Sequence, residues 1–107
     1  MRLGVYGGTF DPIHIAHLII AEQARIDLKL DLVYFVPSYI PPHKPRKIIS
    51  SSHHRLKMVE IAAATNPYFA VSDYEIAKKG TSYTVDTLRH YIETYELTPD
   101  QLFLIIG

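Results

Sequence analysis

A glycine- and histidine-rich stretch, residues 7–17, constrains the fold of this chain more than any other feature. Its sequence is Gly-Gly-Thr-Phe-Asp-Pro-Ile-His-Ile-Ala-His. The apolar run Leu3–Tyr6 before it predicts a buried strand, and the segment from about Ile15 to Leu28 is typical of a helix. Because open α/β sheets bind ligands beyond the carboxyl ends of their strands, we expect a ligand site at residues 7–17.

The chain contains four short apolar runs whose hydrophobic residues are continuous rather than alternating. Such runs are typical of strands that are buried on both faces, as in a parallel sheet. The four runs are Leu3–Tyr6, Leu32–Val36, Phe69–Val71 and Leu102–Ile106. Helical patterns separate them, and their centres lie about thirty residues apart, the length of a βαβ unit. The sequence therefore predicts an α/β fold, a Rossmann-like parallel sheet with helices on both faces, formed by residues 1–107 as a single nucleotide-binding domain.

Two further helices are predicted between the later apolar runs. One begins at about Ser52, its expected N-cap, and the other extends from Ser82 or Thr84 to Tyr95. Residues 76–83 between them are expected to form a basic turn. The apolar residues expected to face the sheet are Leu56, Val59 and Ala63 in the former helix, and Val85, Leu88, Ile92 and Tyr95 in the latter.

The composition limits the partners that this chain can bind. Lys plus Arg and Asp plus Glu number 11 each, so the formal net charge is zero. A neutral chain is not drawn as a whole to nucleic acid or to membranes, and any anion must be bound by local groups. The lack of cysteine excludes disulfides, thiolate zinc sites and cysteine nucleophiles. With no signal peptide and no apolar run near the roughly 20 residues that span a bilayer, we expect a cytoplasmic domain.

Gly7 and Gly8 are candidate anion-binding residues. A glycine pair after a strand lets the backbone take φ > 0 and lets a bulky anion approach the main chain closely. The main-chain N–H groups, together with the N-terminus of the following helix, would then bind the anion. An ordinary tight turn is the alternative, and these residues alone do not decide between the two.

His14 and His17 are three residues apart and are therefore expected to share one face of the first helix. Near the positive end of that helix, two imidazoles could donate hydrogen bonds to phosphate oxygens that gain charge during phosphoryl transfer. The alternatives are two structural histidines, or a zinc pair, although zinc sites on helices usually use His-x-x-x-His spacing. The spacing leaves all three open.

The stretch from Leu32 to Val59 contains no acidic residue. It follows the second predicted strand and leads into the second predicted helix, so it should reach the same sheet edge as residues 7–17. We expect a local phosphate pocket in which Lys44 and Arg55 point inward, with a solvated basic face as the alternative. The basic side chains of the stretch are His43, Lys44, Arg46, Lys47, His53, His54, Arg55 and Lys57.

Ser82, Tyr83 and Thr84 open the third predicted helix. One explanation is capping by a hydroxyl group, with Asp86 in the first turn favoured by the helix dipole. The other is that the Tyr83 ring and the hydroxyl groups face a ligand at the sheet edge. Spacing alone does not separate these explanations.

Taken together, these motifs resemble those of the bacterial nicotinate-nucleotide adenylyltransferases, which belong to the nucleotidyltransferase superfamily with the His-x-Gly-His-type motif. The phosphate motif of that superfamily is similar to residues 7–14, Gly-Gly-Thr-Phe-Asp-Pro-x-His. The resemblance extends over the whole chain, and residues 82–88 favour the nicotinate branch over pantetheine-phosphate or cytidylyl relatives. The other similar segments are Phe35-Val36-Pro37, Pro41-Pro42-His43-Lys44 and His54-Arg55-Leu56.

The resemblance implies a reaction of ATP with nicotinate mononucleotide, with Mg²⁺, that gives deamido-NAD and pyrophosphate. It implies small-molecule partners and no metal held by the protein alone. His14 and His17 would be catalytic and would bind the triphosphate. The main-chain contacts to ATP would come from Gly7, Gly8, Thr9 and Phe10. The residues that would bind nicotinate mononucleotide are His43, Lys44, Arg55, Tyr83 and Thr84.

The chain departs from the family pattern at two places. Ala16 stands where the family usually has glycine, and we expect one added methyl group to be tolerated. After Gly107 the family continues with Ala-Asp, an aromatic loop for the nicotinate and an Ile-Ser-Ser-type motif with an arginine. We therefore expect residues 1–107 to be the N-terminal part of a longer chain and to catalyse poorly alone.

Three other functions stay open from the sequence. They are a non-catalytic nucleotide-binding module, a related nucleotidyltransferase with another acceptor, and a zinc-dependent hydrolase that uses His14 and His17. The sequence decides neither the oligomeric state nor the preference for nicotinate over nicotinamide mononucleotide.

Overall fold

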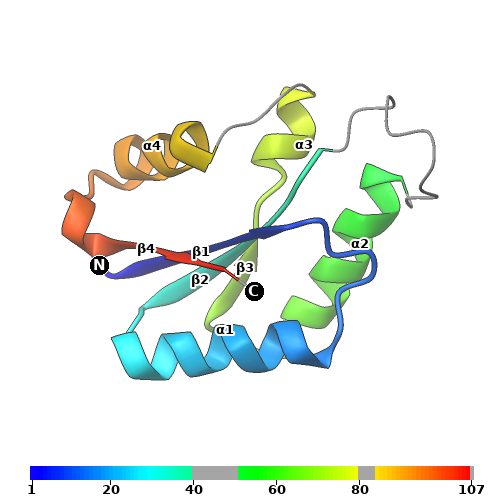
Figure 1. Ribbon diagram of the computed structural model, residues 1–107, viewed down its shortest axis with the longest axis horizontal. Coiled ribbons are helices and arrows are strands. Elements are labelled where there is room, and N and C mark those ends of the chain that lie inside the picture. Colours follow the sequence, from blue (N-terminus) through cyan, green and yellow to red (C-terminus); the bar gives the residue numbers. More distant parts are fainter. Residues whose placement is uncertain (40–50, 80–83, 107) are drawn as a thin grey trace.

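The computed structural model describes residues 1–39, 51–79 and 84–106, which form one sheet with helices on either side (Figure 1). The strands and helices alternate through most of the chain, as the predicted βαβ units require. In order, the elements are β1 (Leu3–Gly8), α1 (Ile15–Leu28), β2 (Leu32–Pro37), α2 (Ser52–Ala63), β3 (Phe69–Val71), α3 (Tyr74–Lys78), α4 (Thr84–Tyr95), a 3₁₀ turn (Pro99–Gln101) and β4 (Leu102–Ile105).

The four strands form a parallel sheet in the order β3-β2-β1-β4. In the ladder, Tyr6 of β1 lies opposite Phe35 of β2 and Ile105 of β4. The chain moves outward from β1 to β3 and then returns to the other side of β1, so the strand order reverses between β1 and β4. This reversal is where doubly wound sheets bind their ligands, and the predicted Rossmann-like fold is confirmed.

Helices cover both faces of the sheet (Figure 1). Side chains of α1 and α2, such as Ala21 and Val59, join one core cluster with Tyr6, Phe35 and Ile105. Tyr91 of α4 joins a second cluster, whose strand residues alternate with those of the first and include Leu3, Val5 and Val36. The continuous apolar runs thus place hydrophobic side chains on both faces of the sheet, as expected for buried parallel strands.

Several predicted boundaries and faces need correction. Ser51, not Ser52, is the N-cap of α2, and its Oγ accepts the His54 N–H at 3.2 Å. Val85 is 58% exposed, whereas Thr87 and Tyr91 form the buried centre of the inner face of α4. Apolar periodicity misses this face because a threonine hydroxyl and a tyrosine ring lie at its centre.

The segment after β3 also differs from the prediction. Tyr74–Lys78 forms the short helix α3, although a turn is predicted from residue 76 onward. The ring of Tyr74 stacks on His90 of α4 with a centroid distance of 3.9 Å, so a tertiary contact supports a helix too short to be stable alone. Ser82, one of the two predicted starts of the last helix, lies outside the described residues. Among residues 1–39, 51–79 and 84–106, no helix is long and apolar enough to cross a membrane.

Candidate functional site

The turn after β1 has its positive backbone dihedral at Phe10, not at the glycines. Gly7 and Gly8 are the last residues of β1, where they pair with Val36 and Pro37, and no described glycine has positive φ. Phe10 has φ of 49°, in the left-handed region. The positive φ that a glycine pair permits is therefore not used here, because both residues stay extended in the parallel ladder.

Gly8 instead provides room for the ring of Phe10. A Cβ at Gly8 would lie 3.3 Å from Cζ of that ring. The ring is 3% exposed, and its centroid lies 5.5 Å from that of Tyr6, 5.1 Å from His17 and 5.7 Å from Phe35, all in T-shaped contacts. These aromatic contacts anchor the turn to the core. The main chain of residues 8–10 is thereby held at the carboxyl end of β1.

His14 and His17 bond the N-terminus of α1 through their Nδ1 atoms. Nδ1 of His14 accepts the Ala16 N–H at 3.3 Å, and Nδ1 of His17 accepts the His14 N–H at 3.0 Å. The two rings lie 4.0 Å apart, centroid to centroid. In a neutral imidazole whose Nδ1 accepts, the proton resides on Nε2. Each ring therefore caps the helix with one nitrogen and keeps an N–H donor on the other.

The surroundings of His17 favour its neutral form. Burial lowers the pKa of His17, and the nearby charge of His14 lowers it further. The half-buried His17 ring also makes a T-shaped contact with Tyr6 at 6.1 Å. A fixed, neutral ring presents its Nε2–H as a preorganised hydrogen-bond donor, which suits a phosphate oxygen that gains charge during a reaction.

Arg55 of α2 lies directly against the turn. Its side chain is 0% exposed, with Nη1 donating to the Thr9 carbonyl at 2.9 Å and Nη2 donating to Ser52 Oγ at 3.0 Å. Burial lowers the pKa of Arg55, and the negative charge of Asp11 opposes that effect. Arginine nevertheless stays protonated in proteins. This burial argues against the direct contact with nicotinate mononucleotide that the resemblance implied, because the guanidinium is directed at the protein itself.

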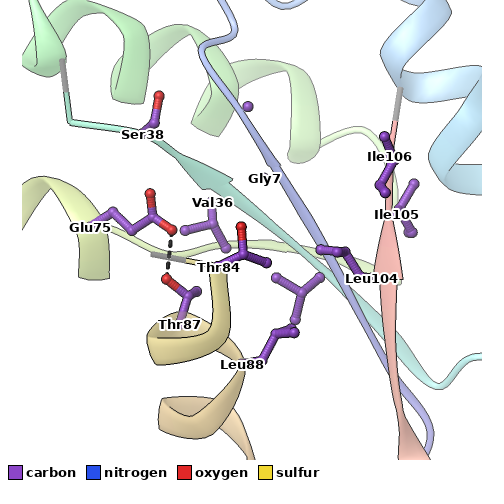
Figure 2. Close-up of a pocket in the computed structure, with 12 residues that line it drawn as sticks. Gly7, Val36, Ser38, Glu75, Thr84, Thr87, Leu88, Leu104, Ile105 and Ile106 are labelled. Carbon is purple, nitrogen blue, oxygen red and sulfur yellow. Dashed lines mark hydrogen bonds between the residues drawn. The ribbon is translucent and has the colours of Figure 1, made fainter. Parts of the chain in front are cut away.

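A pocket of about 390 Å³ lies between α4 and the carboxyl-terminal parts of β1 and β4, next to the glycines that lead into the turn (Figure 2). Gly7 and Gly8 form part of its wall, which also includes Leu104 and Ile105 of β4 and the following residue, Ile106. It therefore lies at the reversal of strand order, where a ligand is expected. Its volume is in the range of about 300–1,000 Å³ that small-molecule sites occupy.

The polar lining of the pocket comes from loops and helices that follow the strands. Ser38 follows β2, Glu75 belongs to α3, and Thr84 and Thr87 belong to the first turn of α4. Thr87 Oγ1 donates to Glu75 Oε2 at 2.6 Å, a contact that joins α3 to α4 (Figure 2). The pocket thus combines an apolar floor with polar groups at its rim.

The structure gathers most of the predicted site residues at one edge of the sheet. His43, Lys44 and Tyr83 lie outside the described residues. Thr84, expected at the site, is exposed at the pocket. The residues brought together at the end of β1 are Gly7, Gly8, Thr9, Phe10, His14 and His17.

Sequence reasoning missed three polar residues of this edge, Ser38, Glu75 and Thr87. Each follows a strand or lies on the helix that covers its end, and that position is the one sequence signal that could have identified them. Thr87 was predicted only as part of a family motif, although a threonine in the middle of a helix face is a candidate for a buried hydrogen bond.

The described residues contain no group of three His, Asp or Glu side chains that could hold a metal ion. A catalytic zinc site needs three protein ligands. His14 and His17 also use their Nδ1 atoms for the helix N-terminus. Within the part of the chain that the structure describes, the pair is therefore better suited to donating hydrogen bonds to an anion than to holding zinc.

Comparison with curated proteins finds close relatives over the whole chain. A probable nicotinate-nucleotide adenylyltransferase of Thermoanaerobacter sp. (strain X514) is 47% identical over 108 residues, which are 100% of this chain and 50% of the relative. One of Citrifermentans bemidjiense is 52% identical over 107 residues, covering 100% of this chain and 49% of the relative. The resemblance drawn from the motifs is confirmed, and the chain spans about half the length of the curated relatives it matches.

Solved structures and family models agree with the fold. The structure of Plasmodium falciparum nicotinic acid mononucleotide adenylyltransferase complexed with NaAD matches with a TM-score of 0.71 at 20% sequence identity. The match covers 96% of this chain and 49% of that chain. The model of the cytidylyltransferase-like family matches residues 5–107. The chain, with its turn, paired histidines and pocket at one edge of a Rossmann-like sheet, therefore belongs to the cytidylyltransferase-like family.

Proposed function

We propose that the full-length protein transfers the adenylyl group of ATP to nicotinate mononucleotide, giving deamido-NAD and pyrophosphate. The observation that carries this proposal is the placement of two distinct sites side by side. The turn with His14 and His17 offers hydrogen-bond donors for phosphates, and the adjoining pocket offers a cavity of about 390 Å³ for part of a second substrate. The names of the relatives at 47% and 52% identity support this choice of reaction.

The chemistry of the proposed reaction is a single in-line displacement. A phosphate oxygen of nicotinate mononucleotide attacks the α-phosphorus of ATP, and the bond from that phosphorus to the bridging oxygen of the β-phosphate breaks. The electron pair of that bond leaves with pyrophosphate. Because a phosphate monoester is already ionised near neutral pH, no strong general base and no covalent enzyme intermediate are needed. Catalysis then consists of positioning and charge stabilisation.

His14 and His17 are assigned to the triphosphate and to the charge of the transition state. Their Nε2–H groups are fixed because the Nδ1 atoms are held by the main chain of α1. Donors that are already oriented need no reorganisation when charge develops on the phosphate oxygens. The main chain of Gly8, Thr9 and Phe10 is assigned to the phosphates and ribose of the same nucleotide.

The pocket at the start of α4 is assigned to the nicotinate end of the second substrate. Thr84 lies at its rim, and the bond between Glu75 and Thr87 fixes the first turn of α4 beside it. Tyr83 would act with Thr84. His43 and Lys44 would contact the mononucleotide from the loop after β2. These three residues lie outside the described part of the chain, and their roles stay predictions.

Mg²⁺ is proposed to enter with ATP and not as an ion held by the protein alone. Mg²⁺ usually keeps several waters and binds substrate phosphates together with one or two carboxylates. The groups at the turn fit this arrangement, because imidazole and main-chain N–H groups would bind phosphate oxygens and not the ion itself. When bound, the ion would neutralise charge on the phosphates. A cytoplasmic location stays a prediction.

The proposal is tested by assaying the full-length protein for pyrophosphate and deamido-NAD with ATP and different acceptors. Nicotinate mononucleotide, nicotinamide mononucleotide and phosphopantetheine are compared, with the His17→Asn protein as the control for contaminating activity. Turnover that depends on nicotinate mononucleotide supports the proposal. Turnover with phosphopantetheine alone would identify a related transferase, and ATP binding without turnover a non-catalytic module.

A further inference from the structure

Arg55 lies buried behind the phosphate turn, where a charged side chain is unexpected. Its relative exposure is 0%, and a buried cation is costly unless its N–H groups are hydrogen-bonded. The guanidinium meets this condition by bonding the Thr9 carbonyl and Ser52 Oγ, with Asp11 as the nearby negative charge. An apolar side chain could fill the same volume more easily. The Thr9 carbonyl that the guanidinium holds offers an explanation for this buried charge.

The Thr9 carbonyl shares a peptide unit with the Phe10 N–H. In a planar trans peptide, the C=O and the N–H of one unit point in opposite directions. A bond from Arg55 Nη1 to the Thr9 oxygen at 2.9 Å thus turns the Phe10 N–H away from α2. The other side of that unit is also fixed, because Phe10 has φ of 49° and its ring is 3% exposed. The peptide between Thr9 and Phe10 is therefore held from both ends.

We infer that Arg55 is a positioning residue: its buried guanidinium orients the Thr9–Phe10 peptide so that the Phe10 N–H donates to a phosphate group of the bound nucleotide. The inference rests on the proposed function for the identity of that nucleotide. Arg55 would thus act on the substrate indirectly, through the peptide that it orients, and not by touching the substrate itself. It also gives α2 a role at the phosphate turn. The two histidines lie at the N-terminus of α1, and Arg55 of α2 supports the turn from behind.

Lysine should not replace Arg55, although it keeps the charge. The guanidinium is a planar fork that reaches two acceptors at once, here on Thr9 and Ser52, whereas an ammonium is a compact point charge on a flexible stem. A lysine side chain at this position would therefore hold the Thr9 end of the peptide less firmly. Charge and geometry can therefore be separated by comparing the R55K and R55Q proteins.

The first test uses the wild-type full-length protein and amide hydrogen exchange read by NMR. With a non-hydrolysable ATP analogue at about ten times its Kd, exchange at the Phe10 amide should slow about tenfold. The Lys57 amide, two residues beyond Arg55 on α2, serves as the internal reference for general stabilisation. Unchanged exchange at Phe10 in a protein that binds the analogue would overturn the inference, whatever happens to any variant.

The second test compares the kinetics of the R55K and R55Q proteins with those of K57Q. Lys57 is exposed, and residues two apart point to opposite sides of a helix, so K57Q removes a cation of α2 without touching the turn. We expect R55K and R55Q to lose about 10- to 100-fold in kcat/KM for ATP, with K57Q unchanged. R55K that unfolds at a lower temperature but keeps the wild-type kcat and KM when folded would show a purely structural role and contradict the inference.

The two proposals fail in different ways. If the wild-type protein forms no deamido-NAD, the proposed function fails, while protection of the Phe10 amide by the ATP analogue would still support the positioning role. If deamido-NAD forms but R55K behaves as wild type, the proposed function stands and the positioning role fails.

Discussion

The main-chain N–H of His14 donates to Nδ1 of His17 at 3.0 Å, which makes the second histidine both part of the helix cap and part of the candidate site. The same bond fixes which nitrogen of His17 carries the proton. Helix stability and donor orientation therefore depend on one contact. A substitution that removes the ring affects both the helix cap and the hydrogen-bond donor. A substitution that keeps an acceptor for the His14 N–H removes the donor but keeps the cap.

Replacing His17 separates the cap from the donor. In His17→Asn, the side-chain oxygen can still accept the His14 N–H, but the outward Nε2–H is lost. We expect both His17→Ala and His17→Asn to lose at least about 100-fold in kcat. Both proteins lose the ring contacts with Tyr6 and Phe10, and the alanine protein should be the less stable of the two by about 0.5–1 kcal/mol, because its cap is also removed. Steady-state assays and urea unfolding measure the two effects, and a wild-type rate in either protein would refute the assigned role.

The stability of the protein should decrease as the pH is lowered, and protonation of His17 should cause part of this decrease. Its pKa is lowered in the folded state by burial and by His14, whereas an unfolded histidine has a pKa of about 6.5. As the pH is lowered below about 6.5, His17 therefore binds a proton in the unfolded chain before it does so in the folded chain. The free energy of unfolding decreases until the pH reaches the pKa of His17 in the folded protein. The free energy of unfolding of wild type should drop more than that of His17→Asn between about pH 7 and pH 5. Parallel curves for the two proteins would show that His17 keeps its ordinary pKa.

Gly8 should tolerate a methyl group less well than Gly7. A Cβ at Gly8 would lie 3.3–3.5 Å from three atoms of the anchored Phe10 ring, whereas the closest atom to a Cβ at Gly7 is a carbonyl oxygen 4.0 Å away. Neither glycine has positive φ, so backbone strain does not complicate the comparison. We expect Gly8→Ala to destabilise the fold by about 1–3 kcal/mol through overpacking, and Gly7→Ala to change stability little. Equal urea midpoints for the two variants would argue against the tight contact with Phe10.

The bond between Thr87 and Glu75 should support the pocket rather than the phosphate turn. Thr87→Val keeps the shape of the side chain but removes the donor to Glu75, and Thr94→Val on the exposed side of α4 is the matched control. We expect Thr87→Val to cost about 1.5–3 kcal/mol of stability, since a bond to a charged group is lost. The KM for nicotinate mononucleotide should rise while that for ATP stays constant. A larger effect on the KM for ATP would contradict the assignment of the two substrates.

Much of the fold could be predicted from the sequence because its strands are continuous apolar runs. The strand Phe69–Val71 has the predicted bounds, and the Ile15–Leu28 helix begins and ends where its pattern does. The helix Tyr74–Lys78 could not be predicted because five residues carry too little periodicity and depend on a tertiary stack with His90.

The site was harder to predict than the fold, because its details depend on packing between elements. The positive φ falls on Phe10 rather than on Gly8, since the ring needs the space that the glycine leaves. Arg55 was expected to face a ligand, since it lies in a basic stretch without acidic residues between a strand exit and the start of a helix. One of its partners, the Thr9 carbonyl, is 46 residues away in sequence, and no local pattern identifies it.

The most direct test of the account is to follow the α-phosphate of ATP. The full-length protein is incubated with ATP labelled with ³²P at the α-position, Mg²⁺ and nicotinate mononucleotide, and the products are separated. Adenylyl transfer to nicotinate mononucleotide predicts that the label appears in deamido-NAD, that the pyrophosphate is unlabelled, and that both products require the mononucleotide. Label that is released as AMP, or that stays in ATP when nicotinate mononucleotide is present, would contradict it.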